Sequence, residues 1–188
     1  MTEAHLTAGT EPRPDDVIGA DRWVAYLDWL RSEIVTAVLS LPDEEQRRSR
    51  LDSGWTPLQL LSHVLHMEQR WFVWGFLGEP VEQPYGDWNV AEPWVTETDQ
   101  TLPGARWQVP DDVTAAQLAQ QWDAVAARTR SVIRRHGPNT PAALGGRFAT
   151  APTPTLEWIL LHVLAEYARH AGHLDIVVEL TPTNGVDG

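Results

Sequence analysis

The chain has 188 residues, of which 43% are hydrophobic and 21% charged, as in an ordinary soluble protein of one domain. Its net charge of −12 argues against a nucleic-acid partner, because a surface that binds phosphates needs concentrated positive charge. Cysteine is absent, which excludes disulfides, cysteine nucleophiles and cysteine-ligated metals.

The N-terminal part of the chain predicts a tail followed by one long helix. Residues 1–16 are polar and contain two prolines, so we expect a loose tail. Apolar residues then recur at helical spacing over residues 17–41, which predicts an amphipathic helix. No signal-peptide core and no apolar run of about 20 residues is readable, so we expect no membrane partner and a cytoplasmic location.

A second helix is predicted to begin at Thr56-Pro57-Leu58-Gln59. Threonine can cap a helix, proline suits its first turn, and glutamine three residues after the threonine completes a capping box. The following stretch, residues 78–111, is rich in Pro, Gly and Trp and is too long for an ordinary connection. We call it the crossover, and we expect its Trp88, Trp94 and Trp107 to pack as a lid over the functional end of the molecule.

The C-terminal half predicts two more helices. One begins near Thr114, with Gln117 available for a capping box, and ends near residue 136. The other opens at Thr153-Pro154 and runs to about residue 180. Four long helices with one long crossover predict an all-α four-helix bundle that is not simply up-down-up-down.

The last predicted helix carries four candidate metal ligands, His162, Glu166, His170 and His173, spaced four, four and three. These spacings place side chains on one helix face, and Glu166 and His170 can converge on one ion. His63, on an apolar stripe of the second helix, is the candidate third ligand. Imidazoles with one carboxylate suit zinc, and also iron or nickel. Three protein ligands leave a coordination position open, as in catalytic sites. His162 is the rival ligand, and His173 is either a ligand or a catalytic general base.

Other charged residues give weaker signals. Arg70 and Arg169 are candidates for binding an anionic group of a substrate or co-substrate, although solvated or ion-paired arginine is the commoner outcome. Glu68 and Asp175 are candidates for orienting the ligand imidazoles, and are equally well read as surface charges.

Two segments resemble a known family. Residues 55–64, with Glu68 and Trp71 following, resemble the second helix of the DinB-like superfamily of metal-binding four-helix bundles, and residues 166–175 resemble its last helix. The resemblance implies one DinB-like domain over residues 1–188, folded as an up-down-down-up bundle with the crossover between helices two and three. It also implies a metal bound by one histidine of helix two and two ligands one turn apart on helix four. Carried over by motif, these ligands are His63, Glu166 and His170.

This His, Glu, His set is similar to that of mycothiol-dependent maleylpyruvate isomerase, a zinc enzyme that uses a low-molecular-weight thiol. Only thirteen residues follow Asp175, so we do not expect the additional C-terminal domain of that isomerase. The resemblance implies a related thiol S-transferase, with mycothiol as co-substrate.

Three functions remain open from the sequence. The first is a metal-dependent S-transferase that activates the thiol of mycothiol toward small electrophiles. The second is a metal-dependent hydrolase or lyase that uses an activated water, with His173 as proton shuttle. The third is a non-catalytic metal-binding stress protein, which a fourth ligand such as His162 would favour. We expect a small-molecule substrate in the first two cases, and a homodimer is the assembly to test.

Overall fold

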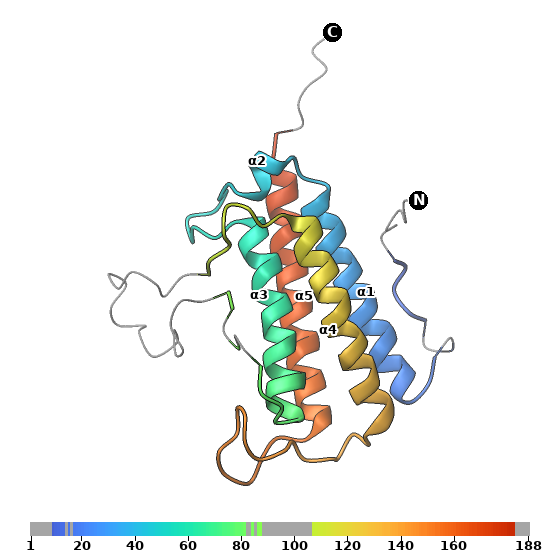
Figure 1. Ribbon diagram of the computed structural model, residues 1–188. Coiled ribbons are helices and arrows are strands. Elements are labelled where there is room, and N and C mark those ends of the chain that lie inside the picture. Colours follow the sequence, from blue (N-terminus) through green and yellow to red (C-terminus); the bar gives the residue numbers. More distant parts are fainter. Residues whose placement is uncertain are drawn as a thin grey trace, which may run out of the picture.

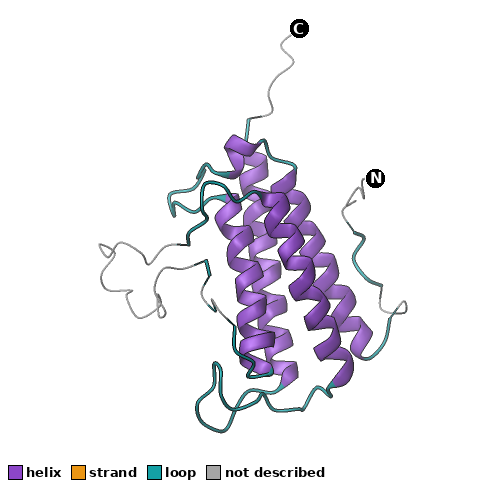
Figure 2. Cartoon of the chain, in the orientation of Figure 1, coloured by secondary structure: helices purple, strands orange, loops and turns teal. Residues whose placement is uncertain are grey.

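The computed structural model describes residues 9–13, 15, 17–81, 84, 86–87 and 107–182. Four long helical segments lie side by side along the molecule (Figure 1). They are α1 (Ala20–Leu39), α3 (Pro57–Gln69) continued by the π-helix η1 (Arg70–Phe76), α4 (Ala115–Arg135) and α5 (Leu156–Leu180), with the short α2 (Asp43–Gln46) after α1. Loops join the helices, and the described residues form no strand (Figure 2), so the predicted all-α class is confirmed.

Both predicted capping boxes are present. The Thr56 hydroxyl accepts a hydrogen bond from the Gln59 backbone N–H, and the Gln59 side chain accepts one from the Thr56 N–H. Thr114 and Gln117 form the same pair of bonds at the start of α4. These caps satisfy backbone donors that have no partner within the helix, and they fix where α3 and α4 begin.

The start of α5 differs from the prediction by two residues. Thr155 caps this helix by accepting a hydrogen bond from the Trp158 N–H. Thr153 instead donates its hydroxyl to the carbonyl of Ala142. The physical reason is that a residue before proline disfavours the helical region, so Thr153-Pro154 belongs to the preceding loop.

Several contacts place particular helix ends together. Arg134, near the C-terminal end of α4, forms an ion pair of 3.0 Å with Asp21 in the first turn of α1. The loop before α5 contacts the end of η1, where the Ala143 N–H donates to the Phe76 carbonyl at 2.9 Å. The N-terminal ends of α1 and α5 therefore lie at the same end of the molecule as the C-terminal ends of η1 and α4 (Figure 1).

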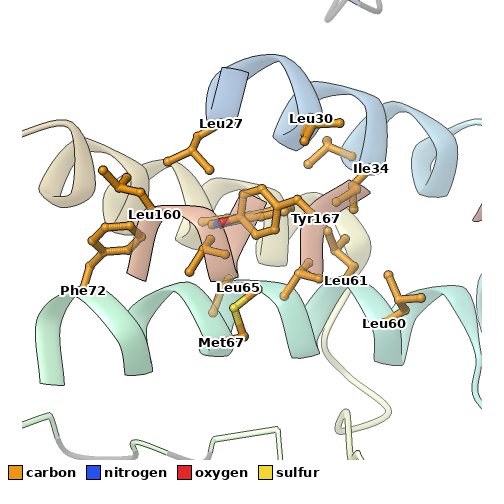
Figure 3. Packing of buried hydrophobic residues seen from close by; sticks show 14 of the residues in the cluster. Leu27, Leu30, Ile34, Leu60, Leu61, Leu65, Met67, Phe72, Leu160 and Tyr167 are labelled. Atoms are coloured by element: carbon orange, nitrogen blue, oxygen red, sulfur yellow. The ribbon is translucent and has the colours of Figure 1, made fainter. Parts of the chain in front are cut away.

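The core is a continuous apolar cluster between these helices (Figure 3). Two leucines and one isoleucine of α1 face leucines of α3, while α5 contributes Leu160 and Tyr167 between them. Burying each such aliphatic side chain is worth about 1.5–3 kcal/mol, so this cluster supplies the main stabilisation. Among the described residues, none of the helices combines the length and apolar character that a membrane crossing requires.

Candidate metal centre

Three of the predicted ligands come together on two helices. His63 lies on α3, whereas Glu166 and His170 lie one turn apart on α5. Each offers one ligand atom, and these three atoms all lie within 4.8 Å of one another. The His170 Nε2 atom is 3.4 Å from a Glu166 carboxylate oxygen, and the rings of His63 and His170 meet edge to face. We call these residues the ligand triad.

The nitrogens of His170 test whether the triad fits a metal. His170 is 7% exposed, yet neither of its ring nitrogens has a hydrogen-bond partner among the described residues. Buried polar atoms are normally paired, because an unpaired one loses its hydration without compensation. A divalent cation between the triad atoms supplies such a partner. Imidazole, imidazole and carboxylate form a donor set that such cations accept, so the residues fit a metal.

Both triad histidines are held in the form that can bind a metal. Burial lowers the pKa of His63 below its ordinary value, against the opposing effect of a neighbouring carboxylate. Burial, together with the positive charges of His63, His173 and Arg169, lowers the pKa of His170 to about 3. Both rings are therefore neutral near pH 7, and a neutral imidazole keeps a lone pair for coordination.

A buried carboxylate, Asp87, orients His63. The Nδ1 atom of His63 lies 3.0 Å from Asp87 Oδ2, and Arg70 donates to the other Asp87 oxygen at 2.5 Å. Burial alone would raise the pKa of Asp87, but the hydrogen bond from His63 and the charge of Arg70 lower it overall. An ionised Asp87 accepts a hydrogen bond from the Nδ1–H group, so Nε2 is the nitrogen that carries the lone pair. This carboxylate–histidine arrangement is the usual support of a metal-binding imidazole.

Sequence reasoning missed Asp87. It lies in the crossover, 24 residues after His63, where no periodicity relates it to the helix. Glu68, one of the predicted orienting residues, does not perform this role. Its carboxylate accepts hydrogen bonds from Arg31, Trp122 and Tyr167 in the core. The reason is helix geometry, since five residues after His63 correspond to a turn of about 140° around the axis.

Trp107 covers one face of His63. Their ring centroids are 3.9 Å apart and nearly parallel, and the edge of Trp107 also faces His170 at 6.0 Å. The backbone N–H of Gln108 donates to the Asp87 carbonyl at 2.6 Å, which ties the two described parts of the crossover together beside His63. The expected lid is therefore confirmed for Trp107, while Trp88 and Trp94 lie outside the described residues.

The other predicted site residues lie around the triad in different environments. His173 is half-buried, with its ring centroid 5.7 Å from that of His170. Arg169 is exposed, and its charge acts on His170. Arg70 is buried and forms the ion pair with Asp87. The catalytic role of His173 and the substrate-binding roles of the two arginines stay predictions.

His162, the rival ligand, lies outside the group of three converging residues. Its ring stacks on Trp158, with centroids 5.4 Å apart and planes 5° from parallel, and it contacts Trp71 at 4.4 Å. Burial lowers its pKa, so it is a neutral ring packed among aromatic side chains. Asp175, the other residue predicted to orient an imidazole, is exposed on α5.

Comparison with known proteins gives one family. The family model described as Mycothiol-S-transferase matches residues 23–182, a range that includes all three triad residues, Asp87 and Trp107. No curated protein and no solved structure matches the chain.

Proposed function

The chain belongs to the mycothiol-S-transferase family, which is DinB-like, and from this premise we propose that it is a metal-dependent enzyme that transfers the sulfur of mycothiol to small electrophiles. The observation that supports metal dependence is the convergence of the triad atoms within 4.8 Å around a buried histidine whose nitrogens have no partner among the described residues. Zinc is the proposed metal, and the same donor set also suits nickel or iron.

The proposed scaffold is a single domain folded as an up-down-down-up four-helix bundle. The ion pair between Asp21 and Arg134 and the contact of Ala143 with Phe76 support these directions. In this arrangement α3 and α4 run in the same direction. Asp87 and Trp107, which are described residues between them in sequence, both lie beside His63.

The triad and Asp87 have separate proposed roles in holding the metal. The triad would hold a divalent metal, which when bound would lower the pKa of the mycothiol thiol. His63 contributes Nε2, because its Nδ1 proton is directed at Asp87. Glu166 contributes a negative charge and His170 a neutral ring nitrogen.

The proposed reaction is a substitution at an electrophilic carbon. The mycothiol thiol gives its proton to a ring nitrogen of His173, a new sulfur–carbon bond forms, and the leaving group departs with the bonding electron pair. The half-buried position of His173 beside His170 supports this role. Arg169 is the proposed contact for an anionic group of the substrate, since it is exposed next to the triad, whereas Arg70 supports Asp87.

Thiol-dependent turnover tests this function. We expect the zinc-loaded protein to accelerate conjugation of mycothiol to a bimane or haloalkane electrophile. Chelation should abolish this rate, and added zinc should restore it. A bound metal would raise the thiolate fraction from about 3% toward completion, a gain of about 30-fold near pH 7, and positioning would add to it. Glu166→Gln should lower the rate, while a change at the distant His136, such as His136→Gln, should not.

Other outcomes would favour the alternative functions. Metal-dependent hydrolysis of an ester or amide panel without added thiol would favour the hydrolase. Tight metal binding with no metal-dependent rate for any thiol or electrophile would favour a non-catalytic binding protein. Either result would contradict the proposed transferase.

We also propose that the chain forms a homodimer through the outward face of α5. Four large apolar side chains of this helix are exposed, namely Trp158, Leu161, Ile176 and Leu180. An exposed apolar stripe of this kind is typical of a contact surface. Sedimentation should give the mass of two chains, and Ile176→Arg should shift it to one. A monomeric wild-type protein at micromolar concentration would contradict this proposal.

A further inference from the structure

A second polar cluster lies inside the core and includes residues of both helices that carry the triad. Glu68 of α3 is fully buried, and Arg31 of α1 donates to both of its oxygens at 3.2 and 3.0 Å. Trp122 of α4 and Tyr167 of α5 donate their indole N–H and hydroxyl to the same carboxylate. We call these four residues the Glu68 cluster. It joins all four long helices at one carboxylate.

A contribution to the stability of the fold does not by itself explain why the Glu68 cluster lies in the core. Removing two charges from water is costly, and well-packed apolar residues often serve a core as well as a buried ion pair does. The surrounding side chains are already apolar, and Tyr167 lies among them between α1 and α3 (Figure 3). Buried polar groups have a better attested role in fixing one relative arrangement of helices, because only that arrangement satisfies all of their hydrogen bonds.

The position of Tyr167 couples the Glu68 cluster to the triad. It directly follows Glu166 and precedes His170 by three residues, while Glu68 lies on the helix that carries His63. The hydroxyl–carboxylate bond therefore spans the same pair of helices as the triad. A shift of α5 by one residue would move its side chains about 1.5 Å along the axis and turn them by about 100°. That shift would break the bond to Glu68 and separate the ligands.

The helix pair that carries the triad is joined by specific contacts as well as by the core. α5 packs more extensively against α1 than against α3 and η1. The hydrogen bond from the Tyr167 hydroxyl to the Glu68 carboxylate is a specific contact between α5 and α3.

We propose that Glu68 and Tyr167 are positioning residues that hold α5 in register against α3, so that the triad is preorganised for its metal. This inference rests on the proposed metal site. A metal site needs its ligands held to about 0.5 Å, and ligands on two different helices reach that precision only when the helices are fixed relative to each other.

Metal binding by Tyr167→Phe tests the inference. This change removes one hydroxyl and keeps the ring that fills the core. We expect zinc affinity, measured by competition with a chromogenic chelator, to fall about tenfold, as for other residues that support metal ligands. We also expect the visible spectrum of the cobalt-loaded protein to change, because the ligand geometry around the ion changes. Glu68→Gln should shift both measurements in the same direction.

Two control variants separate positioning from stability. Tyr26→Phe removes a tyrosine hydroxyl that donates to the Pro12 carbonyl, outside the core, and should leave affinity and spectrum unchanged. Val38→Ala opens a cavity in the core of α1 and should lower stability without changing either. All variants are compared at a temperature where circular dichroism shows them folded.

Three results would contradict the inference. If Tyr167→Phe is less stable but binds zinc and cobalt like the wild type, the cluster is merely structural and the inference is wrong. If Val38→Ala loses as much affinity as Tyr167→Phe, general destabilisation explains the effect and the inference is again wrong. If the wild-type protein binds neither metal, the proposed metal site itself fails, and the inference falls with it.

Discussion

Asp87 is the residue on which the chemistry of His63 depends. It is fully buried, accepts a hydrogen bond from the Nδ1–H group of His63, and is itself held by Arg70. This arrangement fixes the ring orientation and leaves Nε2 as the nitrogen that carries the lone pair. The support comes from outside the two ligand-bearing helices, from the crossover.

We predict that Asp87→Asn weakens zinc binding by about 10–100-fold, because the imidazole loses its charged acceptor and Arg70 is left buried without its carboxylate. Chelator competition measures this effect. The matched control is Asp175→Asn, an exposed carboxylate on α5, which should bind zinc like the wild type. An unchanged affinity of Asp87→Asn would show that His63 needs no such support.

The low pKa of His170 gives a prediction for the metal-free protein. In the unfolded chain this residue takes up a proton near its ordinary pKa of 6.5, whereas in the folded chain it does so only at about 3. The unfolded state thus binds more protons between these values, and stability must fall as the pH is lowered through this range. The contribution of the neutral His170 ring to the free energy of unfolding is therefore fully present above pH 6.5 and is lost progressively below it.

Between pH 7 and pH 5 the size of this effect depends only on the pKa of His170 in the unfolded chain, because the folded-state pKa of about 3 lies below that range. Between pH 7 and pH 5, the free energy of unfolding should fall by about 2 kcal/mol more in the wild type than in His170→Gln, which cannot take up the proton. Urea unfolding in the presence of a chelator measures the difference. Parallel pH dependences of the two proteins would contradict the low pKa of His170.

At the scale of helices, local sequence rules located most elements and the ligands on them. The capping boxes of α3 and α4 were predictable from four residues each, and the four-residue spacing of Glu166 and His170 placed them on one face. Glu68 does not orient a ligand imidazole as predicted. The angle of about 140° around the helix axis between Glu68 and His63 already indicates that they lie on different faces of the helix. Asp87 and Trp107 were beyond such rules, because neither lies on a helix with His63 and no sequence periodicity relates them to it.

The capping box of α3 gives a prediction for this element. Thr56→Ala should lower the free energy of unfolding by about 1 kcal/mol, since it removes the acceptor for the Gln59 N–H. Thr56→Ser keeps the hydroxyl and should lose much less. Urea denaturation compares the three proteins, and equal midpoints for Thr56→Ala and the wild type would show that the cap contributes nothing.

In the molecule as a whole, two polar clusters share one pair of helices. The triad lies on the side of α3 and α5 where Asp87 and Trp107 contact His63, and the Glu68 cluster occupies the core. The first provides the chemistry and the second the proposed alignment of the helices that carry it. A metal that binds across both helices should therefore stabilise the whole fold.

We predict that zinc at one hundred times its dissociation constant raises the free energy of unfolding by about 2.7 kcal/mol, since it binds the folded state only. Urea unfolding with and without zinc measures this gain. His63→Ala should show almost none, because its remaining ligands lie on α5 alone. The same stabilisation in wild type and His63→Ala would place the bound ion elsewhere.

The central claim is that the triad holds one metal ion, and elemental analysis of the purified proteins tests it most directly. Wild type, His63→Ala, His170→Ala and the control His136→Gln are prepared in parallel with limiting zinc. The account predicts about one ion per chain in the wild type and in His136→Gln, and loss of most metal from both triad variants. Full metal content in His63→Ala and His170→Ala would contradict it.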